Sequence, residues 1–217
     1  MTGFIIAVDG PAASGKGTIA VQLGAAYGLP VLDSGLLYRA VGVTLLAAGG
    51  DLADEAAAIT VARRLDPARL ENPDFRTRAA GEAASRVAAY PGVRLALREF
   101  QRGFAAQPGG AVIDGRDIGT VIAPDAPAKL YVTASPETRA RRRWLQLQDT
   151  GAGVDYDDIL ADIRLRDERD AGREDSPMRP AEDAVLLDTT EMSISATADA
   201  ARRIVEAARA KWEQSQR

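Results

Sequence analysis

The chain has 217 residues, of which 46% are hydrophobic and 27% charged, with a formal net charge of −4. This composition suits one α/β domain with a sizeable core and excludes extended disorder or two independent domains. The chain has neither cysteine nor histidine, which excludes disulfides, thiolate catalysis, imidazole metal ligation and most hydrolase mechanisms. The mildly acidic balance argues against nonspecific binding to nucleic acid or anionic membranes. We also expect a cytoplasmic protein, because no secretory leader and no membrane span is evident.

A glycine-rich loop, Asp-Gly-Pro-Ala-Ala-Ser-Gly-Lys-Gly-Thr, follows a predicted strand at 4–8 and leads into a predicted helix at 16–27. Glycines allow backbone conformations in which successive N–H groups face phosphate oxygens beside the positive end of a helix. Lys16 adds a mobile charge, and Thr18 supplies the hydroxyl for Mg²⁺ because Gly17 separates it from the lysine. The predicted phosphate cradle consists of Gly10, Pro11, Ala12, Ala13, Ser14, Gly15, Lys16, Gly17 and Thr18.

Further elements alternate along the chain in the order of an α/β protein. Strands are predicted at 29–32, 111–113, 129–133 and 184–187, and helices at 35–48, 54–65, 78–89, 92–106, 136–149, 155–172 and 195–213. Short apolar runs without alternation are typical of buried parallel strands. The last helix has an apolar face that we expect to join the core. The order predicts a parallel sheet with helices packed against it.

Two carboxylates follow or end predicted strands and are candidate Mg²⁺ ligands. Asp33 lies after the second strand, where it could reach Mg²⁺ or Thr18 while Ser34 caps the next helix. Simple capping is the alternative for Ser34. Asp114 ends an apolar strand and could hold hydrated Mg²⁺ through water, or could serve only as a turn carboxylate.

Arginines gather in three places that could hold a second phosphate. Arg116 and Asp117 lie in a loop flanked by glycines, where a guanidinium can bind phosphate and a carboxylate can accept from a base or sugar. The predicted charged helix places four residues on one face, namely Arg166, Arg169, Asp170 and Arg173. The preceding basic helix repeats this pattern with Arg139, Arg142 and Arg143. Joined by a break at Gly151–Gly153, the two helices are typical of a lid that closes over a triphosphate, although a solvated charged face is the alternative for each.

Several separated motifs together resemble the bacterial cytidylate kinase family, in the P-loop nucleoside monophosphate kinase group. They are the loop 9–18, Leu-Asp-Ser-Gly-Leu-Leu-Tyr-Arg at 32–39, Ala-Ala-Ser-Arg-Val-Ala-Ala at 83–89, Asp-Gly-Arg-Asp-Ile-Gly-Thr at 114–120, and Arg-Asp-Glu-Arg-Asp at 166–170 with Arg173. The resemblance covers nearly the whole chain. Between Asp66 and Ser85 the chain is shorter than the long bacterial form, which carries a small β-sheet insertion there.

This resemblance implies a P-loop three-layer α/β/α fold, ATP as phosphate donor, Mg²⁺, and CMP or dCMP as acceptor. It implies that the acceptor is surrounded by Ser34, Arg39, Ser85, Arg94, Arg116, Asp117, Arg166, Asp170 and Arg173. Lys16, Arg116, Arg166, Arg169 and Arg173 are the expected catalytic residues, and Arg142 is expected to bind ATP. By themselves, Ser85 would count as an ordinary exposed serine and Arg94 as surface charge.

We expect one kinase domain over residues 1–217, and a monomer. Its core is expected at 1–50, 108–138 and 180–217, a helical monophosphate-binding subdomain at 51–107, and a lid at 139–175. Two other functions stay open at this stage. A P-loop and lid also suit kinases of UMP, AMP or a shikimate-like acceptor, and an ATP-binding regulatory module would need the first phosphate site alone. A nucleic-acid enzyme fits poorly, because basic and aromatic residues do not alternate along the chain.

Overall fold

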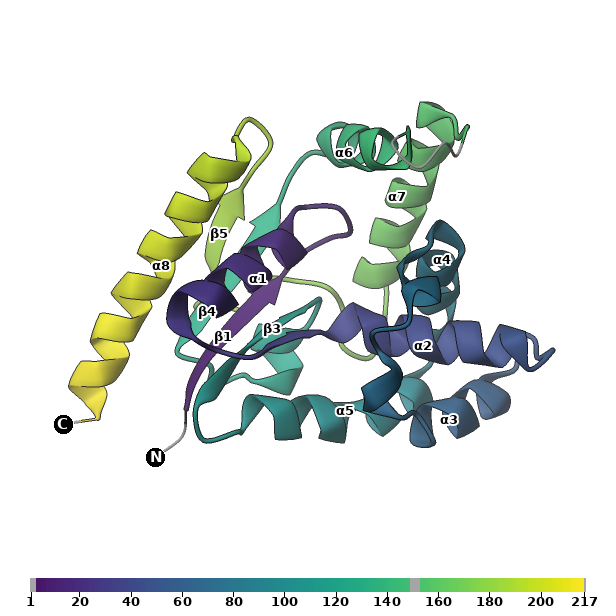
Figure 1. Cartoon of the computed structure of the whole chain (residues 1–217), viewed down its shortest axis with the longest axis horizontal. Helices are drawn as coiled ribbons and strands as arrows, with labels where there is room; N and C mark the ends of the chain where they lie inside the picture. The colour runs from purple at the N-terminus through teal and green to yellow at the C-terminus, as the bar shows by residue number, and fades with distance from the viewer. Residues whose placement is uncertain (1–2, 149–152, 217) are drawn as a thin grey trace. The chain divides into compact units, whose positions relative to one another are not determined.

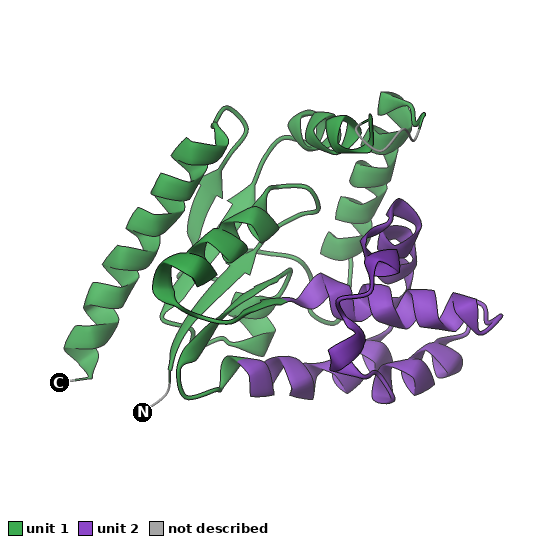
Figure 2. Cartoon of the chain, viewed as in Figure 1, with its two compact units in different colours: residues 1–32, 105–217 green, residues 33–104 purple. Residues whose placement is uncertain are grey.

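The computed structural model describes residues 3–148 and 153–216. The chain divides into two compact units, one of residues 1–32 and 105–217 and the other of residues 33–104 (Figure 2). Gly151 and Ala152, in the predicted break of the lid, lie outside the described residues. The first unit contains the sheet-based core, and the second is helical.

A five-stranded sheet in the order β2-β3-β1-β4-β5 organises the first unit (Figure 1). Its strands are β1 (Phe4–Asp9), β2 (Val31–Asp33), β3 (Gly110–Gly115), β4 (Ala128–Thr133) and β5 (Val185–Asp188). β1 pairs in parallel with both β3 and β4, and β4 pairs in parallel with β5. The predicted α/β class with a parallel sheet is therefore confirmed. Loops that follow parallel strands meet at one edge of the sheet, which is where ligands bind in such folds.

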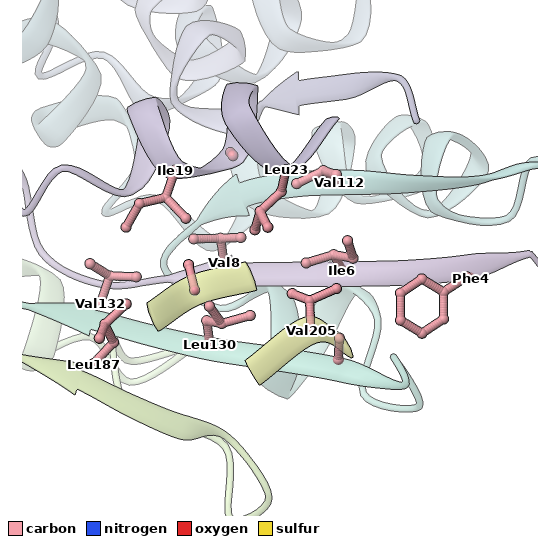
Figure 3. Close-up of a cluster of buried hydrophobic side chains, with 13 residues drawn as sticks. Phe4, Ile6, Val8, Ile19, Leu23, Val112, Leu130, Val132, Leu187 and Val205 are labelled. Atoms are coloured by element: carbon pink, nitrogen blue, oxygen red, sulfur yellow. The ribbon is translucent and has the colours of Figure 1, made fainter. Parts of the chain in front are cut away.

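The core of the first unit forms where apolar side chains of the sheet meet two helices. Ile6 and Val8 of β1 and Leu130 and Val132 of β4 are almost completely buried (Figure 3). Helices α1 (Lys16–Tyr27) and α8 (Ile194–Ser215) cover this cluster. Their buried contributions are Ile19, Ala20 and Leu23 from α1 and Ala201 and Val205 from α8. The expected core role of the last helix is thus confirmed.

Two more helices of the first unit, α6 (Pro136–Gln148) and α7 (Tyr156–Ala171), pack on each other. Ala140, Ile159 and Ile163 form their buried contact. A short helical turn, η3 (Ile118–Ile122), follows β3 and was not predicted from the sequence. It has too few residues for an apolar period to be recognised.

The second unit consists of the helices α2 (Ser34–Ala47), α3 (Glu55–Arg63), α4 (Arg78–Val87) and α5 (Pro91–Ala105) and the short turns η1 (Pro67–Arg69) and η2 (Pro73–Arg76). α2 and α4 approach closely, because a Cβ on Gly42 would lie 2.7 Å from the Cβ of Ala83. The two turns occupy the segment that is shorter than in the long bacterial form. Phe75 of η2 is buried against Leu36 and Ala40 of α2, which fixes this segment to the helix.

Predicted and observed elements differ mainly at their ends. β3 extends through Asp114 to Gly115, so Asp114 lies inside the strand and not after it. α7 ends at Ala171, so Arg173 does not share a helical face with Arg166 and Asp170 as predicted. Gly172 ends the helix, and its N–H is bonded to the Glu168 carbonyl. Among the described residues, no helix is both long and apolar enough to cross a bilayer.

Leu130→Ala should lower the free energy of unfolding by about 2 to 5 kcal/mol, because it leaves a cavity in the centre of the sheet core. Leu165→Ala is the matched control, since Leu165 lies on α7 with 49% of its surface exposed. Urea unfolding of both variants measures the difference. Equal losses would show that the cluster around Leu130 is not the main core.

Candidate active site

The loop after β1 has the backbone geometry of a phosphate cradle. Gly10 has a φ of 146° and Gly15 a φ of 92°, values that favour glycine. A Cβ on Gly10 would also lie only 2.0 Å from the Val132 carbonyl oxygen, so the loop can pass β4 only with glycine there. Gly15 is the N-terminal cap of α1 and provides no capping side chain. The first amides of α1 can therefore face an anion, in addition to the positive end of the helix dipole.

Glycine at position 17 is explained by the space available to it and not, as predicted, by backbone freedom. It has ordinary helical geometry, but a Cβ at this position would lie 3.0 Å from Oδ2 of Asp114. Asp114 therefore lies against the first turn of α1, and its Oδ1 is 3.8 Å from the Nζ of Lys16. Lys16 also donates to the Pro11 carbonyl at 3.4 Å. This places a buried carboxylate beside the lysine, at the first turn of α1.

These residues fit Mg²⁺ bound together with a nucleotide. Mg²⁺ in such sites uses one or two carboxylates or hydroxyls and takes its other ligands from phosphates and water. Asp114 and Thr18 can supply such ligands on the first unit. No group of three or more acidic side chains with metal-site geometry occurs among residues 3–148 and 153–216.

Asp9, at the end of β1, is a functional candidate that the sequence did not single out. Its carboxylate is buried and accepts from the N–H groups of Ile118 at 2.8 Å and Gly119 at 2.7 Å. Burial raises the pKa of Asp9 to about 7, against the two amides, which lower it. The carboxylates of Asp117 and Asp114 add a smaller rise. Its partners lie more than a hundred residues away, which explains why sequence inspection missed the contact.

The loop after β3 and the end of α7 share one charged cluster. Asp170 accepts from Arg116 Nε at 3.0 Å through Oδ2 and from Arg173 through Oδ1. Burial raises the pKa of Asp170, but the guanidiniums of Arg116, Arg173 and Arg166 outweigh burial, and the net pKa lies below the ordinary value. Arg173 reaches this carboxylate from beyond the helix. Three of the predicted acceptor-binding residues are thus brought together within the first unit.

Arg139 and Arg142 of α6 bind other parts of the protein and are not part of a solvated charged face. Arg139 is buried and makes two hydrogen bonds to Asp167 of α7, at 3.1 and 2.5 Å. It also donates to the Ala12 carbonyl of the phosphate loop at 3.2 Å. Asp167 is therefore an acidic neighbour that offsets the charge of Arg139. The sequence did not indicate this pair, because Arg139 and Asp167 lie on different helices and are 28 residues apart.

Arg142 contacts the other end of the phosphate loop. It donates to the Thr189 carbonyl at 2.6 Å and to Thr189 Oγ1 at 2.9 Å, and Thr189 Oγ1 lies 3.2 Å from the Ser14 carbonyl oxygen. Thr189 is buried just after β5. Arg142 thus lies beside the cradle, as an ATP-binding residue would, and Thr189 is its unpredicted partner.

In the second unit, Asp33 and not Ser34 caps α2. Its Oδ1 accepts from the Gly35 N–H at 2.9 Å, and Ser34 is the first helical residue. The predicted cap is therefore wrong, because an Asx turn at Asp33 starts the helix one residue earlier. Arg39, one turn further along, donates to the carbonyls of Phe75 at 3.0 Å and Thr77 at 3.3 Å.

Ser85 and Arg94 are both buried, contrary to the ordinary expectation for a serine in an alanine-rich helix and for a surface arginine. Ser85 is 9% and Arg94 4% exposed. The guanidinium of Arg94 lies 5.7 Å from the centre of the Tyr38 ring, within range of a cation–π contact. Arg94 is therefore not an ordinary surface arginine.

Comparison with known proteins decides the family. The family model described as cytidylate kinase matches residues 6–208. The chain belongs to the cytidylate kinase family. A cytidylate kinase of Caulobacter sp. (strain K31) is 67% identical over 209 residues, covering 96% of this chain and 97% of the relative. A cytidylate kinase of Xanthobacter autotrophicus (strain ATCC BAA-1158 / Py2) is 61% identical over 207 residues, covering 95% and 99%. The chain is therefore a kinase.

A crystal structure of an uncharacterised protein from Eubacterium ventriosum ATCC 27560 has a similar fold. It matches with a TM-score of 0.53 and 14% identity, over 95% of this chain and 98% of that one. At this identity the likeness supports the fold of this cytidylate kinase family member and nothing further. Family membership also implies a nucleotide-kinase reaction that uses ATP and, in general, Mg²⁺.

The raised pKa of Asp9 predicts a pH effect on the stability of this family member. Between about pH 4 and 7 the folded state keeps a proton on Asp9 that the unfolded state has lost, so this contribution to stability decreases as pH rises. From pH 5 to pH 8, the wild type should lose about 2 to 3 kcal/mol more unfolding free energy than Asp9→Asn does. Urea unfolding at each pH measures it. Parallel pH profiles for the two proteins would contradict the prediction.

Proposed function

We propose that this chain transfers the γ-phosphoryl group of ATP to CMP and dCMP, giving ADP with CDP or dCDP. Membership of the cytidylate kinase family is the observation that carries the proposal. Within the first unit, a phosphate cradle follows β1, and Arg116, which follows the neighbouring strand β3, joins Asp170 and Arg173 from the end of α7. Two such positively charged places support two anionic substrates. A regulatory module that only binds ATP would need the cradle alone.

The donor phosphates belong at the loop after β1. Lys16 and the backbone N–H groups of residues 10–18, other than Pro11, would bind the terminal phosphates of ATP, and Arg142 would lie beside them. Thr18, Asp114 and Asp33 are the candidate ligands of Mg²⁺. When bound, Mg²⁺ supplies charge neutralisation at the phosphates. The contact of Asp114 with the first turn of α1 supports its assignment.

Each unit contains residues that we propose as candidates for binding the acceptor nucleotide. In the first unit, Arg116 would bind the acceptor phosphate, Arg166 and Arg173 would neutralise charge during transfer, and Asp117 and Asp170 would accept hydrogen bonds from the base or sugar. In the second unit, Arg39 and Arg94 would bind the acceptor phosphate and Ser85 would contact the base or sugar. Ser34 is the fourth candidate of this unit for binding the acceptor. The burial of Ser85 and Arg94 supports their inclusion. The pKa of Asp170 lies below the ordinary value, so this carboxyl is ionised and can accept.

The chemistry needs no general base from the protein. At neutral pH an oxygen of the CMP phosphate is already an anionic nucleophile, so it forms the new bond to the γ-phosphorus while the bond to the β,γ-bridging oxygen breaks. The protein aligns the two substrates and neutralises their charge with Lys16, Arg116, Arg166, Arg169 and Arg173. The absence of histidine is consistent with this mechanism. The subdomain at 51–107 and the lid at 139–175 are proposed to close over the substrates and exclude water.

ADP formation from ATP should depend on Mg²⁺ and on an acceptor, with rapid turnover for CMP and dCMP and at least tenfold slower turnover for UMP, AMP and GMP. A coupled assay with each acceptor and with none measures this. Turnover only with another acceptor would contradict the cytidine assignment. Lys16→Ala tests the role of the lysine in the same assay. It should lose most of kcat and keep the circular dichroism spectrum of the folded protein. Full activity of this variant would show that Lys16 has no catalytic role.

Asp170→Ala should raise KM for CMP about tenfold and change KM for ATP by less than threefold, because the lost contacts orient the acceptor side of the site. Asp158→Ala is the control, since Asp158 is an exposed carboxylate on the same helix. Steady-state kinetics with each substrate varied in turn gives both values. Equal changes in the two KM values would count against the role of Asp170.

A further inference from the structure

The turn η3 begins with amides that its own backbone cannot satisfy. Its internal bonds run from the N–H groups of Val121 and Ile122 to the Asp117 carbonyl and from the Ala123 N–H to the Ile118 carbonyl. The first N–H groups of any helical turn need partners from outside it. Asp117 stands at the position of the cap, but its side chain makes no capping bond to this turn. The partner of the first two amides is the Asp9 carboxylate, from another strand.

We propose that Asp9 is a positioning residue for the acceptor-binding loop 115–119, holding its first two helical amides so that Arg116 and Asp117 point correctly at the nucleoside monophosphate. This proposal rests on the proposed function, because it assumes that these two residues bind the acceptor. Asp9 contacts the backbone of this loop, so its effect on catalysis would pass through the loop.

The position of Asp9 is fixed by the pairing of its strand in the sheet. It lies in the central strand of the sheet, which is bonded on both sides, and is in register with Gly115 of β3 and Tyr131 of β4. The side chain is 4% exposed. Because the strand cannot easily shift, the carboxylate is the fixed partner and the loop is the part that follows it. Each oxygen accepts one amide, which defines both the distance and the rotation of the turn.

Gly119 supports this geometry from the side of the loop. A Cβ on Gly119 would lie 3.3 Å from Asp9 Oδ2 and 3.2 Å from Cδ of Lys129. Contacts of this length force a neighbour to move by a few tenths of an ångström. The backbone therefore comes close to the carboxylate only because residue 119 has no side chain. Gly119→Ala changes the same contact from the opposite end, without altering a charge.

Asp9→Asn is the principal test, since it preserves shape but turns one acceptor oxygen into an NH₂ group facing an N–H. We expect KM for CMP to rise about tenfold at pH 8 and KM for ATP to change by less than threefold. Asp125→Asn, at an exposed carboxylate of the same unit, should leave both values unchanged. A rise of the same size in both KM values, or no change in either, would overturn the proposal.

A double-variant comparison separates positioning from general destabilisation. If Asp9 acts through Arg116, its effect should be largely lost once Arg116 is removed. Adding Asp9→Asn to Arg116→Ala should then raise KM for CMP by much less than the rise of about tenfold that we expect for Asp9→Asn alone. Multiplication of the two effects would mean that Asp9 does not act through this loop, and would overturn the proposal.

Gly119→Ala provides the second route should Asp9→Asn fail to fold. We expect it to raise KM for CMP severalfold while the thermal melt stays within a few degrees of the wild type and KM for ATP stays within threefold. Unchanged KM for CMP would overturn the proposal. Failure of the proposed function is a separate result, because it would be seen as absent CMP turnover by the wild-type protein.

Discussion

β1 is the element on which the candidate site depends, because it is bonded to a parallel strand on each side and is buried except for the partly exposed Ile5. Ile6 and Val8 are in full contact with the core, so the strand has little freedom to move. The phosphate loop starts from its last residue, and Asp9 at that residue also holds the turn after β3. A single strand is thus continuous with the loop proposed to bind the donor, and one of its side chains holds the turn that follows the loop proposed to bind the acceptor.

Several arginines of the first unit form ion pairs with aspartates of the same unit. Asp170 forms ion pairs with both Arg116 and Arg173, and Asp167 forms one with Arg139. This arrangement stabilises cationic side chains that would otherwise repel each other beside the phosphate loop. A phosphate that binds there would join a network already ordered, so less side-chain entropy is lost on binding. Arg139 differs from the others because its contacts join α6, α7 and the Ala12 carbonyl, which makes it more a structural tie than a ligand-binding group.

Local patterns in the sequence predicted the parts of the fold that depend on local physics. The glycine loop, the buried strands and most helices were found, because backbone freedom, apolar runs and periodicity are encoded within a few residues. The contacts of Asp9, Asp167 and Thr189 were not found, since each joins segments distant along the chain. The helix end at Ala171 was also missed. Gly172 marks it, but Arg173 continues the charge pattern past that glycine. The family resemblance identified Ser85 and Arg94, which carry no local signal of their own.

The contact between Thr189 and the phosphate loop has a consequence for biosynthesis. Thr189 Oγ1 and the Ser14 carbonyl are separated by 175 residues, and Arg142 meets the same threonine. During translation the chain emerges from its N-terminus, so the loop is made long before the residues that support it. The nascent protein would therefore bind nucleotide weakly until the fifth strand has left the ribosome. Ligand affinity would then be acquired late in synthesis, after most of the polypeptide has already collapsed.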